Sequence, residues 1–313
     1  MVCCLNPDCD RPFNSETQKF CQCCGDALTP LLKNRYQVVK PLGRGGFART
    51  YLAIDQQTGQ SCVVKQLAYR GTGAWLQENA THLFRQEAKQ LEQLAGHPQI
   101  PQLVEQFSED RSFYLVLTYI QGQDLKQELQ QQGLFGDRKV RSLLLDLLPL
   151  LDFIHQRQVV HGDIKPENLV RSQTQKLVLI DFGIALATSE RAGQRTVGLG
   201  SPGYAAPEQM EQAKVLPASD LFGLGITCVQ LLTGQIPAEL WSQHGYAWIK
   251  GWQQALAKPL SPQSTLILNR MVQPNLNQRY ASATEVLKDL QFVSPSPNQA
   301  PQPKRKFWSR WFK

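Results

Sequence analysis

Four cysteines near the start of the chain have the spacing of a metal site. Cys4 and Cys9 are separated by four residues, Cys21 and Cys24 by two, and the two pairs by 11 residues. Two cysteine pairs on turns can close a tetrahedral site of four sulfurs, and Gly25 permits the tight turn after the second pair. Four thiolates favour Zn²⁺, with iron as the alternative. A segment of about 30 residues buries little core, so the metal would supply its folding energy.

This arrangement resembles a minimal zinc ribbon, and it leaves two nearby cysteines unassigned. Cys3 and Cys23 are either spare thiols beside the site or redox sensors that form disulfides and release the metal. Cys62 and Cys228 lie in apolar runs and are expected to be small core residues.

A glycine-rich turn is the second candidate for chemistry. Residues 42–48 read LGRGGFA between two strand-like runs. Its glycines let backbone amides approach phosphate oxygens without a Cβ in the way. It is not a Walker loop, because no Gly-Lys-Ser/Thr follows. Lys65 lies on a later strand, where a lone lysine usually faces solvent; a pairing with Glu87 on the next helix would give it another role.

The densest set of reactive groups is the stretch HGDIKPEN, from His161 to Asn168. It is followed by IDFG at 180–183 and AAPE at 205–208. In this order and spacing the motifs resemble those of bacterial eukaryotic-like (Hanks-type) serine/threonine protein kinases, over a stretch from about Tyr36 to about Leu290. The lysine in D-x-K-x-x-N is typical of serine/threonine rather than tyrosine kinases. The resemblance implies an α+β, two-lobed kinase fold with ATP in the cleft.

The resemblance also implies a role for each reactive group. Transfer of a phosphoryl group needs charge neutralisation and alignment more than covalent help. Asp163 would accept or orient the proton of the substrate hydroxyl, and Lys165 would reach the transferring phosphate. Asn168 and Asp181 would hold Mg²⁺ or Mn²⁺, because oxygen ligands suit a hard cation. Protein serines and threonines would be the substrates.

ATP-binding positions follow from the same resemblance. Lys65 would grip the α- and β-phosphates, fixed by an ion pair with Glu87. The strand Tyr114–Ile120 resembles the hinge, with a gatekeeper side chain, backbone groups that meet adenine, and an acid after it on the ribose. The expected cofactor-binding residues are Leu42, Gly43, Arg44, Gly45, Gly46, Phe47, Ala48, Thr50, Val63, Lys65, Glu87, Leu117 (the gatekeeper), Thr118, Ile120, Asp124 (the ribose acid) and Val170.

Two further matches concern the scaffold around the site. Asp220, in SDLFGLG, resembles the helix aspartate that braces the catalytic loop. Arg279, in NQRY, resembles the arginine that pairs with Glu208. The chain departs from the family pattern where a third glycine, an adenine-covering valine and a small alanine usually stand: Ala48, Thr50 and Val63.

Gly162 occupies the place where many kinases of this family have an arginine. That arginine binds a phosphate on the activation segment and so orders it. Glycine cannot, so phosphorylation there is predicted not to be the main on-switch, and control is expected from the cysteine module or the tail. The candidate acceptors in segment 181–208 are Thr188, Ser189 and Thr196, with Arg191 and Arg195 nearby.

These groups need elements to position them. Strands are predicted at Tyr36–Lys40, Thr50–Asp55, Ser61–Leu67, Phe113–Ile120 and Lys176–Ile180, and helices at Thr81–Ala95 and Asp137–Gln156. The predicted division is a zinc-ribbon-like module over 1–29, a kinase domain over 34–292 (N-lobe 34–120, C-lobe 121–292), and a linker with a tail over 293–313.

Composition limits the alternatives. The chain has 313 residues, 42% of them hydrophobic, and a formal net charge of +7. The stretch after Val293 contributes five basic residues and no acid, which leaves +2 for the rest. No nucleic-acid-binding surface is therefore expected. No apolar run approaches about 18 residues and no signal pattern starts the chain, so a cytoplasmic location is predicted. In that setting clustered cysteines indicate metal rather than disulfides.

The end of the chain has a composition of its own. Residues 293–303 are rich in Ser, Pro and Gln and predict a flexible linker. KRKFWSRWFK follows at 304–313; as a helix it would have an aromatic face and a basic face, typical of contact with the inner face of a membrane. A solvated tail, or docking back on the kinase, are the alternatives.

Two rivals to the kinase hypothesis remain open. One is a nucleotide-binding pseudokinase scaffold regulated through the cysteine module. The other is a small-molecule kinase, which shares H-x-D and DFG-like acids; AAPE, Asp220 and Arg279 disfavour it because they build a platform for protein substrates.

Overall fold

The computed structural model describes residues 2–6, 8–44, 48–68, 74–109, 112–182, 186–187 and 200–291. Several predictions fall on residues outside this part of the chain. Membrane contact and a cytoplasmic location also stay predictions. The predictions outside it concern the turn residues Gly45, Gly46 and Phe47, the acceptors Thr188, Ser189 and Thr196 with Arg191 and Arg195, and the linker and tail.

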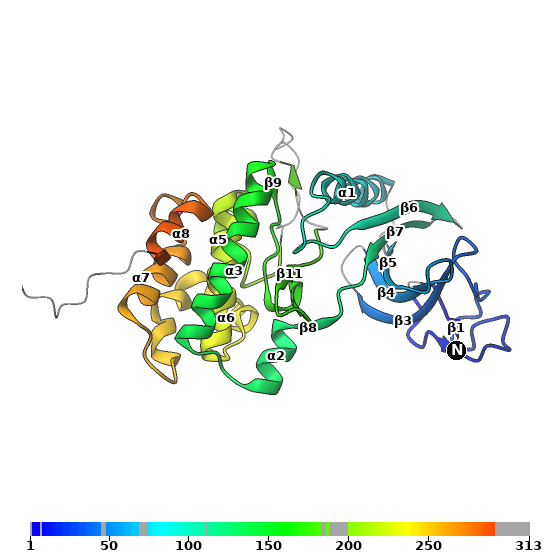
Figure 1. Ribbon diagram of the computed structural model, residues 1–313, viewed down its shortest axis with the longest axis horizontal. Helices are drawn as coiled ribbons and strands as arrows, with labels where there is room; N and C mark the ends of the chain where they lie inside the picture. The colour runs from blue at the N-terminus through cyan, green and yellow to red at the C-terminus, as the bar shows by residue number, and fades with distance from the viewer. Residues whose placement is uncertain are drawn as a thin grey trace, which may run out of the picture.

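The first half of the molecule is built on a five-stranded antiparallel sheet (Figure 1). Buried and half-buried residues alternate along its second strand, as expected for a sheet with one face on a core. A long helix, α1 (Ala74–Gln93), packs against this sheet. In spatial order the strands are β3 (Tyr36–Arg44), β4 (Ala48–Asp55), β5 (Ser61–Leu67), β7 (Ser112–Thr118) and β6 (Leu103–Glu109).

The second half is mainly helical. Two small sheets, β11-β10-β8 and β12-β9, lie between it and the large sheet. The helices are α2 (Leu125–Gln132), α3 (Asp137–Gln156), α4 (Pro207–Gln212), α5 (Pro217–Thr233), α6 (Pro237–His244), α7 (Pro262–Met271) and α8 (Ala283–Gln291), with 3-10 segments η1 (Pro166–Asn168), η2 (Gly245–Ala255) and η3 (Leu276–Gln278). The short strands are β8 (Gly122–Asp124), β9 (Val159–Val160), β10 (Leu169–Ser172), β11 (Leu177–Leu179) and β12 (Leu186–Ala187).

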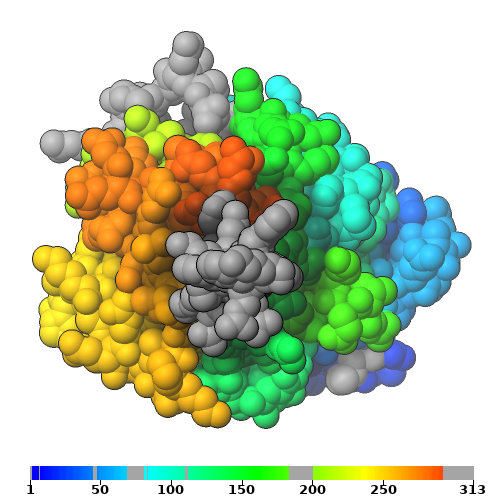
Figure 2. All heavy atoms as spheres, turned by 60° about the vertical axis from the view of Figure 1, so that its left-hand side comes forward, coloured from blue at the N-terminus to red at the C-terminus, as the bar shows by residue number. Residues whose placement is uncertain are grey.

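Helix α5 is the centre of the helical half. Its residues from Ala218 to Leu232 are all buried, and most of them are apolar. Around it pack α3, α7 and η2, and α8 closes against α3 and α7, at the end of the molecule that faces the viewer in Figure 2. Within the described residues no single helix has the length and apolarity of a membrane span; α5 with the segment 237–255 passes that test only as a pair bent by 108°.

All seven predicted elements are present. The two strands at 36–40 and 50–55 are longer than predicted, whereas those at 113–120 and 176–180 are shorter, and Ser61–Leu67 matches. The helix Asp137–Gln156 begins and ends as predicted, whereas α1 starts seven residues before Thr81. Sequence reasoning missed β6. Half-buried and exposed positions alternate along this strand, as they should in a sheet. One half-buried position holds Glu105, which bonds Arg35 and Tyr36, so the sequence lacks the alternation of apolar and polar residues that marks a strand.

The cysteine-rich start of the chain packs against the large sheet. Strand β1 (Val2–Cys3) pairs with β2 (Phe13–Asn14) and lies against β3. Cys3 is 1% exposed and shares a core with Tyr36 and Tyr51, whereas Cys23 is exposed. The two leftover thiols therefore lie in different surroundings, and Cys3 is a core residue. Cys62 and Cys228 are also buried, as predicted.

Candidate active site and metal centre

A lysine on the sheet is held between two carboxylates. Lys65, on β5, donates from Nζ to both carboxylate oxygens of Glu87 at 2.7 Å, and Glu87 comes from α1. The same ammonium donates to Asp181 Oδ1 at 2.6 Å. Burial disfavours the charged lysine, but the two carboxylates outweigh it and raise the pKa of Lys65. The lysine is therefore charged and fixed in place rather than facing solvent.

Asp181 joins the two halves of the molecule at this point. Its backbone is left-handed, with φ +67°, a conformation that costs a non-glycine residue roughly 1–2 kcal/mol. The Lys65 ammonium lowers the pKa of the Asp181 carboxyl to about 2, so the group is ionised at neutral pH. The side chain stays half exposed, which leaves room for a ligand beside it.

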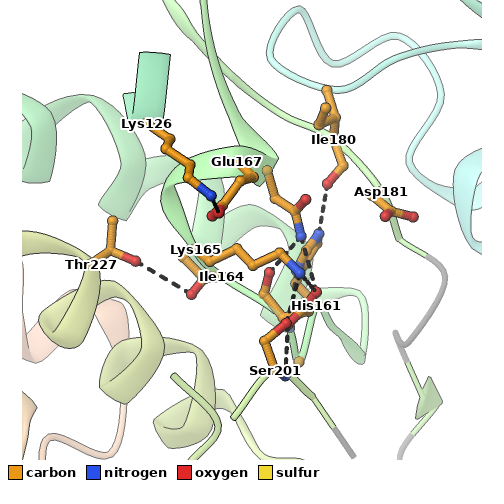
Figure 3. Close-up of polar contacts among 12 residues, drawn as sticks. Lys126, His161, Ile164, Lys165, Glu167, Ile180, Asp181, Ser201 and Thr227 are labelled. Carbon is orange, nitrogen blue, oxygen red and sulfur yellow. Dashed lines mark hydrogen bonds and ion pairs between the residues drawn. The ribbon is translucent and has the colours of Figure 1, made fainter. Parts of the chain in front are cut away.

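The loop from His161 to Asn168 places two polar side chains, Lys165 and Asn168, against the Asp163 carboxylate (Figure 3). Lys165 Nζ donates to Asp163 Oδ2 at 2.7 Å. The Asn168 amide nitrogen donates to the Asp163 carbonyl at 2.8 Å and to Oδ2 at 3.2 Å. Asn168 thus orients its amide nitrogen toward Asp163 and keeps its oxygen as a potential ligand atom.

Asp220, on the buried helix α5, braces this loop. Its Oδ2 accepts from the His161 amide at 2.9 Å, and its Oδ1 accepts from the Gly162 amide at 2.7 Å. His155 Nε2 lies 2.8 Å from Oδ2. Gly162 has φ +77°, which glycine adopts without strain. The loop conformation is therefore held by one carboxylate from the core, as the sequence had suggested for Asp220.

Ser201 is a functional residue that sequence reasoning missed. Its hydroxyl accepts from Lys165 Nζ at 2.7 Å, and its amide donates to Asp163 Oδ1 at 3.0 Å. It thereby contacts both reactive side chains of the loop. The available signal was a hydroxyl residue between Gly200 and Pro202, four residues before AAPE, but a lone serine in a loop has no periodic pattern to mark it.

The expected nucleotide-binding residues lie on several elements. Val63 and Leu117 are cross-strand partners on β5 and β7, and Ala48 packs on the same core. Leu42, Gly43 and Arg44 end β3, and Thr50 lies opposite Gly43 on β4. Ile120 follows β7, and Val170 on β10 pairs with Asp124 on β8.

Two of these residues have structural bonds of their own. The Thr118 amide donates to the Gln102 carbonyl at 3.0 Å, and its hydroxyl accepts from the Gln102 amide at 2.9 Å. Asp124 caps the start of α2, where Oδ1 accepts from the Gln127 amide at 2.8 Å, and burial raises the pKa of its carboxyl.

A second buried ion pair supports the scaffold below the loop. Arg279 Nη1 and Nη2 donate to the two carboxylate oxygens of Glu208 at 2.7 and 3.2 Å. Ser219 also donates to Glu208, at 2.7 Å. The Arg279 side chain is fully buried, so the pair lies in the core and fixes the AAPE segment against α5.

The four cysteines predicted to bind metal come together in space. The sulfurs of Cys4, Cys9, Cys21 and Cys24 all lie within 4.8 Å of one another. Cys4 and Cys24 are 3.5 Å apart, and Cys9 and Cys21 are 3.6 Å apart. In a tetrahedral site with Zn–S bonds of about 2.3 Å, neighbouring sulfurs are separated by ~3.8 Å. The donor set and its spacing therefore fit a metal ion.

Local amides favour ionisation of one of these thiols. Burial alone would raise the pKa of Cys21, but N–H groups of Cys24, Cys23 and Asn14 lower it to about 6. Burial raises the pKa of Cys9 to about 12. Four thiolates therefore cannot coexist here without a cation that compensates their charge.

Comparisons with known proteins agree with this geometry. The protein kinase domain family matches residues 36–292. The chain is 38% identical over 303 residues to serine/threonine-protein kinase B of Synechocystis sp., covering 93% of this chain and 52% of that protein. It is 41% identical over 280 residues to kinase C of the same organism, covering 84% and 51%. It is 36% identical over 290 residues to PknA of Nostoc sp., covering 88% and 51%. The chain thus spans about half the length of these relatives.

Proposed function

Because this chain belongs to the protein kinase family, we propose that it is an ATP-dependent serine/threonine protein kinase. One observation carries the proposal. Asp163 lies among Lys165, Asn168 and Ser201 in a single hydrogen-bonded network. This is the arrangement needed to act on a hydroxyl and an incoming phosphate together.

In the proposed reaction the acceptor oxygen bonds to the γ-phosphorus of ATP, and the bond from that phosphorus to the β–γ bridging oxygen breaks. Asp163 orients the acceptor hydroxyl and receives its proton, because its carboxylate is held by donors that do not use up its acceptor capacity. Lys165 stabilises charge on the transferring group. Lys65 holds the nucleotide phosphates, with Glu87 as its partner.

Asn168 and Asp181 are the residues that would hold Mg²⁺ or Mn²⁺. Their oxygens are hard ligands, and the Asn168 nitrogen is already engaged by Asp163. When bound, the metal would neutralise phosphate charge that builds up during transfer. The ionised state of Asp181, maintained by Lys65, suits it to that task.

We also propose that Cys4, Cys9, Cys21 and Cys24 bind one Zn²⁺ in a module of residues 1–29, ahead of a kinase domain over 34–292. The sulfur spacing and the amide donors to Cys21 support this assignment. Four thiolates favour zinc, and iron is the alternative that metal analysis would reveal.

The test is to incubate the purified chain with Mg²⁺ and ATP labelled at the γ-phosphate, with and without a generic basic protein. We expect labelled phosphoserine or phosphothreonine in the protein fraction. MgATP binding without any transfer would instead indicate a pseudokinase scaffold. Label found only on small-molecule acceptors would contradict a protein substrate.

A further inference from the structure

The cysteine cluster is joined to the sheet by one buried arginine. Arg49, on β4, is 7% exposed. Its guanidinium donates to the carbonyl of Asn6 at 2.7 Å and to the carbonyl of Cys9 at 2.8 Å. Both acceptors belong to the loop that runs from Cys4 to Cys9. In Figure 1 this dark blue segment lies beside β3 and β4.

Arg49 stands at one particular end of the β3–β4 hairpin. It lies opposite Arg44, and these two residues form the last described pair before residues 45–47 of the glycine-rich turn. Arg44 in turn reaches Asp8 Oδ1 at 3.7 Å. Both strands are thus tied to the Cys4–Cys9 loop at the end where the hairpin leads into that turn.

The bonds of Arg49 depend on how that loop is held. Carbonyl acceptors fix a guanidinium only when their own backbone is fixed, and Cys9 is both an acceptor for Arg49 and a member of the four-sulfur cluster. Loss of a bound metal would release Cys9 and so loosen the backbone that carries both carbonyl acceptors of Arg49.

We propose that Arg49 is a positioning residue that couples metal occupancy of the cysteine cluster to the affinity for MgATP. It acts by holding the end of the hairpin where Gly43 and Thr50, two residues expected to bind nucleotide, are paired across β3 and β4. This inference rests on the proposed kinase function and deepens it, because it gives the cysteine cluster a role in nucleotide binding.

A matched control is available on the same hairpin. Arg35, directly before β3, makes a bidentate pair with Asp55 on β4 at 2.8 and 2.7 Å and also donates to Glu105 on β6. Arg35 and Asp55 lie at the opposite end of the hairpin from the turn. Loss of Arg35 removes a guanidinium and its bonds from the same sheet, and neither of these partners belongs to the Cys4–Cys9 loop.

The experiment measures the Kd of MgATP by calorimetric titration of the full chain, zinc-loaded and after removal of zinc by a chelator. Zinc content and circular dichroism are recorded for each sample. We expect Arg49→Gln to weaken MgATP binding by about tenfold with zinc retained, Arg49→Lys to weaken it less, and Arg35→Gln to change it less than about twofold. Removal of zinc should weaken wild-type binding about tenfold but leave the Kd of Arg49→Gln nearly unchanged.

The outcomes separate the two claims. Equal Kd values for wild type and Arg49→Gln, or additive effects of zinc removal and Arg49→Gln, would overturn the coupling while leaving the kinase function intact. A wild-type chain that binds no MgATP would overturn the proposed function itself. If Arg49→Gln does not fold, Arg49→Lys serves instead, and a wild-type Kd for that variant with no response to zinc would reject the coupling.

Discussion

The catalytic loop and the cysteine cluster are both tightly packed sets of reactive groups, but they differ in where their compensating charges come from. Asp163 has Lys165 and the Ser201 amide beside it, and Asp220 accepts from two loop amides. The cluster instead gathers four thiols, of which Cys21 has the clearest donors. The loop can therefore be ordered by folding alone, whereas the proposed metal site would take its compensating charge from a bound cation.

This difference predicts the largest effect for loss of zinc ligands. The double substitution Cys21→Ser, Cys24→Ser should abolish binding of the single zinc, because structural sites of this kind contribute about 10–16 kcal/mol only when all four sulfurs are present. Cys23→Ser is the control, since Cys23 lies between them in sequence but is not in the cluster. Metal analysis showing full occupancy after the double substitution would reject this ligand set.

A smaller effect is expected where buried charges are paired within the chain. Arg279→Met should lower the free energy of unfolding by about 3–5 kcal/mol, because Glu208 would be left buried without its partner. Arg270→Met is the matched control: this arginine is 46% exposed and pairs with Glu285 and Asp289 at 3.4 and 3.6 Å, worth at most about 1 kcal/mol. Urea denaturation followed by circular dichroism measures the free energy of unfolding of both variants. Equal losses of this free energy would show that the buried Glu208 pair contributes no more than the exposed pairs of Arg270.

The smallest effect is expected on the activation segment. The loop is braced by Asp220, and Gly162 offers no cation for a phosphate. Replacing Thr188, Ser189 and Thr196 together with Ala should therefore change phosphate transfer to an exogenous substrate by no more than severalfold. A loss of about a hundredfold, or ~2.7 kcal/mol on the activation barrier, with folding intact would show that a phosphate is needed to order the site.

The parts of the site that could be predicted from the sequence lie in short motifs or follow the helical spacing of apolar residues. Asp163, Asn168 and Asp181 stand in short ordered motifs, and Glu87 has helical spacing. The ion pairs of Glu87 and Asp181 with Lys65, and the contact of Asn168 with Asp163, could therefore be anticipated. The two-lobed fold followed from the same motifs and is confirmed by the family match.

The missed features share a physical cause. Ser201 acts through a hydroxyl and an amide in a loop, and Arg49 binds backbone carbonyls of a segment 40 residues away. Side chain to backbone contacts between distant segments leave no residue pattern, because any residue supplies a carbonyl. Cys3 was unassigned for a related reason: the core that it joins is built mainly from β3, β4, β5 and β7, which are distant in sequence.

In the proposed kinase, Asp163 acts on the acceptor hydroxyl within a site that the chain orders by itself. The most direct test is Asp163→Asn, with Asp152→Asn on α3 as the control, measured for phosphate transfer and for the Kd of MgATP. We predict that Asp163→Asn lowers transfer by about 10²–10⁴-fold while MgATP binding stays near that of wild type, because the Asp163 carboxylate bonds Lys165 and Ser201, whereas Lys65 bonds Glu87 and Asp181. Wild-type turnover in Asp163→Asn would contradict the account.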